Sequence, residues 1–184
     1  MKFIEQLKER AKQNKKTIVL PETSDMRTIE AAGKVLAEGI ANIILVGDKE
    51  DIMSRAGDID LSGASFVDPK NYEKFDEYVD AFVEMRRKKG MTEARAKELL
   101  LTNPLYFGCM MVKQDDADGM VAGAINASAD VLRAALQTLK TAPGTRIVSA
   151  FFLVVVPDCQ YGANGTFVFA DAGLNQSPSA SELA

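Results

Sequence analysis

The feature that most constrains the fold is an alternation along residues 1–144 of short apolar segments with amphipathic helical segments. Residues 17–20 (TIVL) and 41–46 (ANIILV) are almost continuously apolar, which is typical of strands buried on both faces. After each of them a helical segment is predicted before the next strand. Strands joined in this way form a parallel sheet. The sequence therefore predicts an α/β fold, a mostly parallel sheet with helices on both faces in three α/β/α layers.

The predicted helices have recognisable ends. Ser24 is expected to cap a helix that stops at Gly39, and a long helix that begins near Tyr72 runs into the basic cluster 86–89 and stops at Gly90. The other elements expected before residue 118 are an opening helix from Phe3, a short helix at 49–55, a strand at 65–69 and helices at 92–101 and 104–113.

The pattern changes after Gly144. The most apolar run of the chain, 147–156 (IVSAFFLVVV), is followed by a turn-rich segment and by the predicted strand 167–173, with no helix between them. We therefore expect a first α/β domain at 1–144 and the start of a second α/β subdomain at 145–184.

The last residues predict the start of a further helix. Pro178 precedes Ser179, and Glu182 stands where a capping box requires it. Two further residues are too few for a helix. This pattern predicts that the chain is the N-terminal part of a longer protein with a truncated second subdomain, whose uncovered strands should make the isolated chain associate or bind a hydrophobic dye.

Composition excludes several classes of chemistry. The chain has no histidine, so Ser-His-Asp triads, histidine bases and most catalytic zinc sites are excluded. Cys109 and Cys159 lack a C-x-x-C partner, which argues against a disulfide framework or a structural zinc site. There is no G-x-G-x-x-G motif that opens a helix and no P-loop motif. We expect no metal and no cofactor.

Charge and hydropathy indicate a small-molecule partner. The 22 basic and 26 acidic residues are mixed along the chain and give a net charge of -4, so no basic stripe predicts nucleic-acid binding. No apolar run reaches the length of about 18 residues that a membrane span needs. Glu5 and Glu9 interrupt what would be the apolar part of a signal peptide. A cytoplasmic protein without nucleic-acid or membrane partners is expected.

The strongest candidate site is the strand-to-helix junction in residues 118–133 (DGMVAGAINASADVLR). The strand is expected to end near Ala122, at the sheet edge where parallel α/β folds bind ligands, and the next helix offers free N–H groups to an anion. Asn126 and Ser128 are small donors, and Arg133 can meet a phosphate with its planar guanidinium. The competing interpretation is that Ser128 is only a helix cap, Arg133 a solvated residue and Asp130 a first-turn acid favoured by the helix dipole.

Three other segments are weaker candidates. PETSDMR places Glu22, Ser24 and Arg27 at the end of the first strand, where they either line the same edge or serve only as a helix cap and a surface arginine. Arg86 lies beside the apolar stripe of the long helix, so it either points inward or is solvated with its basic neighbours. Cys159 follows an apolar strand, but without histidine a covalent nucleophile is not expected there.

Taken in order, the segments of the chain resemble the phosphate acetyltransferase (phosphotransacetylase) family. The matching blocks are KTIVLPETSDMRT, IANIILVGD, YVDAFVEMRRKKGMT, YFGCMMVK, ADGMVAGA, SADVLRAALQTLKTAPG, SAFFLVVVPDCQYGANGTFVFAD and NQSPSASELA. They cover essentially all 184 residues. The resemblance implies a two-domain α/β enzyme whose first domain is interrupted by the second and completed by a returning segment beyond Ala184.

The resemblance also implies an activity and its residues. The family transfers an acetyl group reversibly between coenzyme A (CoA) and phosphate, by direct attack of the CoA thiolate on acetyl phosphate in a ternary complex, and is expected to act as a homodimer. By position, Arg86 and Arg133 match family arginines implicated in binding substrate anions at the cleft, and Arg27 matches another arginine of that region. Ser128, Asp130 and Asn126 belong to the family's polar turn, and Cys159 matches a cysteine near the CoA site.

Two positions depart from the family pattern. Asn126 stands where the family usually has histidine, and Ala134 follows Arg133 where a proline is usual. The family's proposed general base belongs to the part beyond Ala184. Two alternatives therefore remain open: a phosphate butyryltransferase-like enzyme, and a non-catalytic domain that senses acyl-CoA.

Overall fold

The computed structural model of the chain describes residues 3–145, 147–170, 174 and 179–180. By its internal contacts the chain forms two compact units, Met1–Lys140 and Thr141–Ala184. This division falls four residues before the boundary at 144/145 that the sequence suggested. Pro178 and Glu182, which belong to the predicted capping box, lie outside the described residues.

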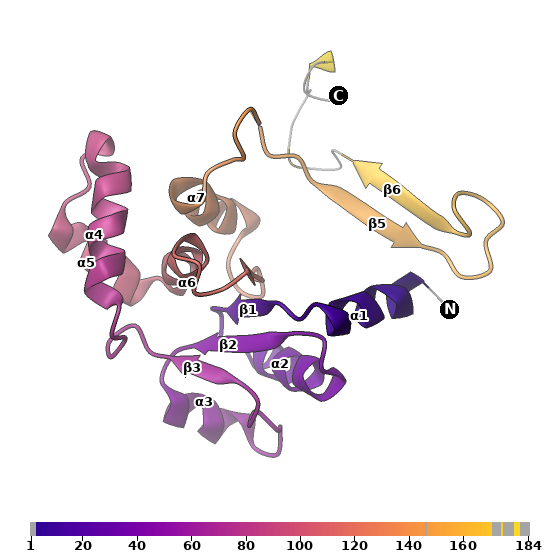
Figure 1. The fold of residues 1–184 in the computed structure, drawn as a ribbon, viewed down its shortest axis with the longest axis horizontal. Helices are drawn as coiled ribbons and strands as arrows, with labels where there is room; N and C mark the ends of the chain where they lie inside the picture. Colours follow the sequence, from indigo (N-terminus) through magenta and orange to yellow (C-terminus); the bar gives the residue numbers. More distant parts are fainter. Residues whose placement is uncertain (1–2, 146, 171–173, 175–178, 181–184) are drawn as a thin grey trace. The chain divides into compact units, whose positions relative to one another are not determined.

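Unit 1 is built on a parallel sheet of four strands, in the order β3-β2-β1-β4 (Figure 1). The strands are β1 (Thr17–Leu20), β2 (Asn42–Val46), β3 (Ser65–Val67) and β4 (Gly119–Met120). All three pairings are parallel, with Val19 opposite both Ile44 and Met120. Parallel neighbours must be joined by crossover connections, and each connection between successive strands of this sheet contains at least one helix.

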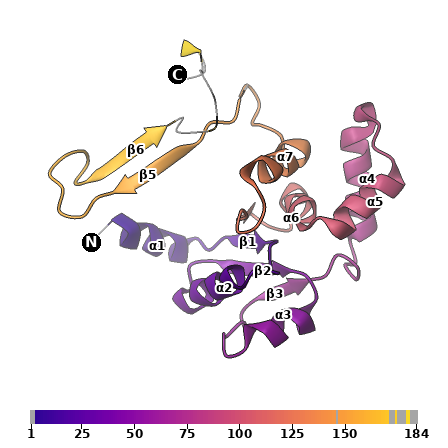
Figure 2. The same ribbon diagram turned by 180° about the vertical axis from the view of Figure 1, so that it is seen from behind.

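Helices cover both faces of this sheet, as the sequence predicted (Figures 1 and 2). In β2, Ile43 and Leu45 pack with α2 and α3 in one core cluster, whereas Ile44 and Val46 pack with α4 to α7 in another. Successive side chains of a strand point to opposite faces, so a continuously apolar strand feeds two cores. The helices of unit 1 are α1 (Phe3–Gln13), α2 (Met26–Glu38), α3 (Lys49–Ala56), α4 (Phe75–Arg86), the 3₁₀ turn η1 (Arg87–Lys89), α5 (Glu93–Thr102), α6 (Pro104–Lys113) and α7 (Ser128–Thr138).

The ends of α2 show one confirmed and one wrong prediction. Gly39 terminates the helix in the left-handed conformation at φ 66°, as expected of glycine at that position. The N-cap is Asp25, whose carboxylate accepts from the Arg27 N–H, and not Ser24. The difference has a physical reason: the Asp25 carboxylate also accepts from the Arg27 guanidinium, which a serine hydroxyl does less well.

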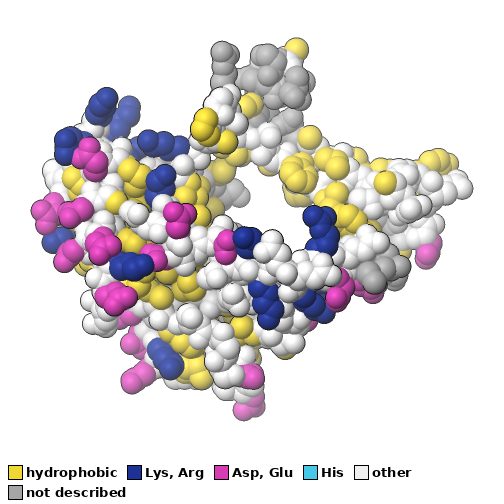
Figure 3. Space-filling model, viewed as in Figure 1, with side chains coloured by type: hydrophobic (Ala, Val, Ile, Leu, Met, Phe, Trp, Pro, Cys, Tyr) yellow, Lys and Arg dark blue, Asp and Glu magenta, His cyan; other side chains and the backbone are white. Residues whose placement is uncertain are grey.

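The described part of unit 2 contains an antiparallel hairpin of β5 (Phe151–Val155) and β6 (Thr166–Ala170). Its apolar side chains are largely exposed, among them Phe151, Phe152 and Phe169 at 67%, 62% and 54%. Figure 3 shows these hydrophobic side chains along the hairpin. The two strands occur where apolar runs were predicted, and the α/β nature of the whole second subdomain stays a prediction.

No helix of the described residues is long and apolar enough to cross a membrane. Within the same residues, no group of three or more Cys, Asp or Glu side chains is arranged to hold a metal ion.

Candidate functional site

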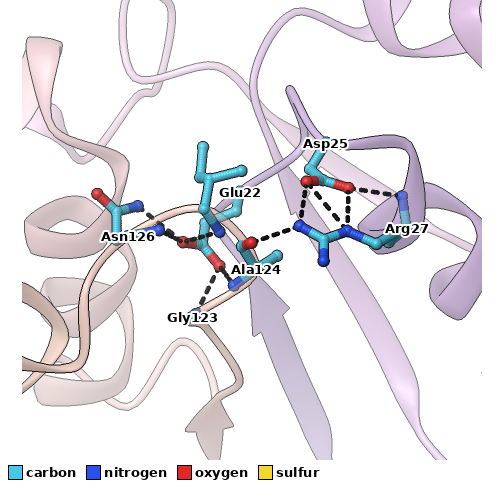
Figure 4. A network of polar contacts seen from close by, with 7 residues as sticks. Glu22, Asp25, Arg27, Gly123, Ala124 and Asn126 are labelled. Atoms are coloured by element: carbon cyan, nitrogen blue, oxygen red, sulfur yellow. Dashed lines mark hydrogen bonds and ion pairs between the residues drawn. The ribbon is translucent and has the colours of Figure 1, made fainter.

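The junction between β4 and α7 is held by a buried carboxylate. Glu22 follows β1 by two residues and is only 2% exposed. Its Oε2 accepts the N–H groups of Gly123 and Ala124, both at 2.6 Å. Its Oε1 accepts those of Ile125 at 3.2 Å and Asn126 at 2.9 Å, together with the Asn126 amide nitrogen at 2.7 Å (Figure 4). Four consecutive backbone donors and one side chain therefore converge on a single carboxylate.

These donors keep Glu22 ionised. Burial by itself raises the pKa of a carboxyl group, because it removes water from the charged form. The hydrogen bonds from Asn126, Ala124 and Ile125 outweigh that effect and lower the pKa of Glu22 from 4.5 to about 2. A carboxylate in this position acts as an internal counter-charge to the partial positive charges of the loop amides.

The loop conformation explains why β4 is shorter than predicted. The strand was expected to end near Ala122, but β4 ends at Met120, and Val121 makes the last bond to β1 through Val19. From Gly123 onward the backbone N–H groups turn toward Glu22 and are unavailable to a sheet. Gly123 has φ 107°, a conformation that side-chain-bearing residues rarely adopt, so glycine is suited to this turn.

Arg27 lies on the other side of the same loop. Its guanidinium pairs with Asp25, at 2.7 Å between Nη2 and Oδ2, and Nη2 also donates to the Ala124 carbonyl at 2.5 Å (Figure 4). Of the two interpretations of PETSDMR, these contacts therefore support the one in which it lines the same sheet edge as the 118–133 segment. Arg27 is 71% exposed at its side chain, so an anionic ligand can still approach it.

The start of α7 differs from the expected cap. Ala127 is the N-cap residue, and no side chain caps the helix; Ser128 is the first helical residue. Ser128 is exposed, as is Arg133, which lies one turn beyond it and forms an ion pair with Asp130 at 2.5 Å. The hydroxyl of Ser128 is thus not used as a helix cap.

Arg133 and Arg86 line the same pocket, although they come from different helices. The pocket has a volume of about 380 Å³ and lies among the end of α4, η1 and helices α5 to α7. Its lining also includes Lys89, Arg95 and one acidic residue, Glu98, so four cationic side chains and one carboxylate line the same space. In Figure 3 basic side chains gather over this end of α4 and α5. Such a concentration of positive charge favours an anionic ligand.

The cations of this pocket are only partly neutralised, by Glu98 in the lining and by the ion pair of Arg133 with Asp130. Among the described residues, the arginines in ion pairs are Arg27, Arg55, Arg87 and Arg133, and each of them pairs with an aspartate or glutamate two to four residues away in the sequence. Arg86 is not one of them, and its Nε is buried without a hydrogen-bond partner within the described part of the chain. A buried unpaired donor is costly, so an acceptor from a ligand would stabilise it.

Sequence reasoning missed part of this pocket. Arg95, Tyr106 and Gln137 had not been singled out, and Lys89 had only been noted within the basic cluster. Tyr106 donates a hydrogen bond to Gln137 Oε1 at 3.1 Å, and burial raises the pKa of its hydroxyl. Helix phase gives no signal for which faces of α5, α6 and α7 meet, so the lining residues follow only from the packing.

The cysteines do not contribute to this pocket. Cys109 is fully buried in the core, and burial raises the pKa of its thiol, which disfavours the thiolate. Cys159 is half-buried in the β5–β6 connection of unit 2, so its predicted place near a CoA site stays a prediction.

The fold and site define a class of protein. It is an α/β protein in which a loop at the sheet edge, residues 123–126, is held by the Glu22 carboxylate, and in which helices form a pocket lined by cationic side chains. The chain matches the model of the phosphate acetyl/butaryl transferase family over residues 2–184, and it belongs to this family.

Individual relatives agree with this membership. The chain is 54% identical to a phosphate acetyltransferase of Acetivibrio thermocellus over 183 residues, and 52% identical to one of Thermoanaerobacterium thermosaccharolyticum over 184 residues. Each match covers 100% of this chain but only 55% and 56% of the relative. A crystal structure of a phosphotransacetylase from Streptococcus pyogenes superposes with a TM-score of 0.87 at 34% identity, covering 100% of this chain and 55% of that one.

Proposed function

We propose that the protein carrying this chain is a phosphate acetyltransferase, which converts acetyl-CoA and phosphate reversibly into acetyl phosphate and CoA. The observation that carries the proposal is the pocket that joins Arg86 and Arg133, in a chain whose relatives are named for this reaction. Since the chain spans about 55% of those relatives, the complete reaction is a property of the longer protein.

In the direction that forms acetyl-CoA, the CoA thiolate attacks the carbonyl carbon of acetyl phosphate. The new C–S bond forms as the C–O bond to phosphate breaks, and phosphate leaves with the bonding electrons. Charge develops on the carbonyl oxygen and on the departing phosphate, so fixed cations and donors lower the barrier. The reaction needs no histidine, and we propose no cofactor besides the substrates.

The pocket cations have a defined part in this scheme. Arg86 and Arg133 bind a phosphate group of a substrate, and the unpartnered Nε of Arg86 gains an acceptor when they do so. Arg27 offers a further cation at the sheet edge, where it contacts the loop that contains Asn126. Ser128 and Asp130 follow this loop in the sequence, at the start of α7. Cys159 remains a candidate for the CoA site only through the family resemblance.

Ligand binding tests this assignment directly on the chain. Arg133→Gln and Arg86→Gln are each expected to weaken CoA binding by roughly tenfold or more, because a charge-assisted contact is lost. Arg10→Gln provides a matched control, since Arg10 is an exposed arginine of α1 outside the pocket. Isothermal titration with CoA and with inorganic phosphate measures the loss. Equal affinity in all three variants and the wild type would contradict the assignment.

Turnover by the full-length protein tests the reaction itself. We expect CoA-dependent release of phosphate from acetyl phosphate, and faster release than from butyryl phosphate, because the similar relatives are named acetyltransferases. CoA binding without turnover would favour a non-catalytic sensor of acyl-CoA. Preference for butyryl phosphate would place the protein in the butyryl branch that the family description also names.

We further propose that the full protein is a cytoplasmic homodimer. The support is the family resemblance, together with the exposed apolar hairpin of unit 2, which is a surface suited to burial. Light scattering coupled to size exclusion, and fractionation of cells, measure these two properties.

A further inference from the structure

We infer that Glu22 is a positioning residue: it occupies the amide donors of loop 123–126 as an internal anion, holds the start of α7, and leaves the Arg86–Arg133 pocket as the place for substrate phosphate. This inference rests on the proposed function, since it concerns where the substrate anion binds. The loop at the sheet edge and the start of a helix would otherwise be the expected phosphate site of a parallel α/β fold.

The donors of the loop are already used. A carboxylate has about four lone-pair directions, and Glu22 accepts five hydrogen bonds with its two oxygens. All four consecutive backbone N–H groups from Gly123 to Asn126 donate to it, and Figure 4 shows those of Gly123, Ala124 and Asn126. A phosphate could reach these amides only by displacing a buried, ionised side chain, which would leave that charge without its donors at a large cost.

The same bonds fix the position of α7. The helix has no side-chain cap, and its N-cap residue Ala127 directly follows Asn126. The backbone that enters the helix is therefore tied to the rest of the sheet through Glu22, from the end of β1. Arg133 lies less than two turns into α7, so a displaced start of this helix moves its guanidinium relative to Arg86.

The arrangement requires a charge as well as a shape. Glutamine at this position would present an NH₂ group where Glu22 presents an oxygen, and this group would face backbone N–H donors. Aspartate keeps the charge but is shorter by one methylene. Alanine removes both and leaves a space lined by the loop donors, which a small carboxylate such as formate fits chemically.

The test compares CoA affinity in the wild type, Glu22→Ala and Glu22→Gln, with and without formate, by isothermal titration. We expect both variants to lose affinity on the order of tenfold, because Arg133 is no longer held in place. Formate is expected to restore most of the affinity of Glu22→Ala and little of that of Glu22→Gln. Glu30→Ala serves as the matched control, because Glu30 is an exposed glutamate of α2. This variant should bind CoA as the wild type does.

The opposite pattern would overturn the inference. Wild-type affinity in both Glu22 variants, or competition of formate with CoA in Glu22→Ala, would show that the loop is not positioned in this way. If the wild type binds neither CoA nor phosphate, it is the proposed function that fails, so the two failures are distinguishable.

A measurement on the wild type removes the dependence on variants that fold. In nuclear magnetic resonance spectra, added inorganic phosphate should shift the guanidinium Nε–H signals of Arg86 and Arg133 more than the amide signals of residues 123–126. Larger shifts of the loop amides than of the arginines would mean that phosphate displaces Glu22, and the inference would be wrong.

Discussion

Strands β2 and β5 have similar composition and opposite surroundings. Both consist of five residues, NIILV and FFLVV, but four residues of β2 are buried whereas four of β5 are exposed. β2 lies between β1 and β3 in a sheet whose crossovers bring helices over both faces. Within the part of the chain that the structure describes, β5 pairs only with β6, and the connection between them contains no helix. An apolar run thus predicts a strand, whereas the connections on either side of it determine whether it is covered.

The largest expected effect comes from matched leucine truncations in the two strands. Leu45→Ala in β2 removes a fully buried side chain and should lower the free energy of unfolding by about 2–5 kcal/mol, since a cavity remains. Leu153→Ala in β5, at 40% exposure, should cost less than about 1 kcal/mol. Urea unfolding followed by circular dichroism measures both. Similar losses at the two leucines would break the comparison.

The second prediction concerns the acid stability of unit 1. The pKa of Glu22 is lowered to about 2 in the folded chain from an ordinary 4.5, so its stabilising contribution is present above about pH 4.5 and is lost as the pH falls toward 2. The loss should amount to about 3 kcal/mol. Urea unfolding between pH 6 and pH 2 should therefore show a smaller acid-induced loss of stability in Glu22→Gln than in the wild type.

A control separates Glu22 from the other carboxylates with lowered pKa values, such as Asp25 and Asp116. Glu30→Gln changes an exposed glutamate and should keep the pH dependence of the wild type. The same pH dependence in Glu22→Gln and the wild type would contradict the role of the loop donors.

The third prediction tests whether the hairpin can be lost without the sheet. Gly165 has φ 81°, and a Cβ at this position would lie 2.1 Å from the Val156 carbonyl oxygen, so Gly165→Ala should disrupt the pairing of β5 and β6. Gly144→Ala is the control, because Gly144 has φ 85° but open space around it. Cross-strand nuclear Overhauser effects between Leu153 and Val168 report the pairing. Loss of unit 1 signals together with these contacts would show that the two units do not fold separately.

The smallest effect on stability is expected from the exposed aromatic residues. Phe152 and Phe169 lie opposite each other, and the double substitution to serine should change the free energy of unfolding by less than about 1 kcal/mol. It should, however, reduce dye binding and self-association of the isolated chain, because an exposed apolar patch is removed. Dye fluorescence and sedimentation velocity measure these changes, and unchanged values would exclude the hairpin as the associating surface.

Much of the fold of unit 1 was predictable because its signals are local. Continuous apolar runs gave β1 and β2, Gly39 and Gly90 gave the ends of helical segments, and the order of elements gave the parallel sheet. The cap at Asp25 and the early end of β4 were missed. The cap depends on the side-chain contact of Asp25 with the Arg27 guanidinium, which apolar periodicity does not report, and the end of β4 depends on the Glu22 carboxylate, about a hundred residues away in the chain.

The site was only partly predictable for the same reason. The sequence singled out Asn126, Ser128, Asp130 and Arg133 as candidates in one segment, and the structure shows that Arg27 contacts the loop of this segment at the Ala124 carbonyl. The pocket shared by Arg86 and Arg133 could be suggested by family resemblance, but Arg95 and Gln137 gave no local signal. Which helix faces converge depends on the packing of α4 to α7 against the sheet.

The sequence by itself determined the α/β class, because the periods of its apolar residues are imposed by local geometry and by burial. The tertiary structure decided what the polar residues do. Glu22 and the loop amides are about a hundred residues apart in the chain, as the 101-residue separation from Gly123 shows, and they meet because β1 and β4 are parallel neighbours whose ends lie at the same edge. Hydrogen bonds and charge act over a few ångströms in space, so only the fold could assign the loop donors to Glu22 and bring the pocket cations together.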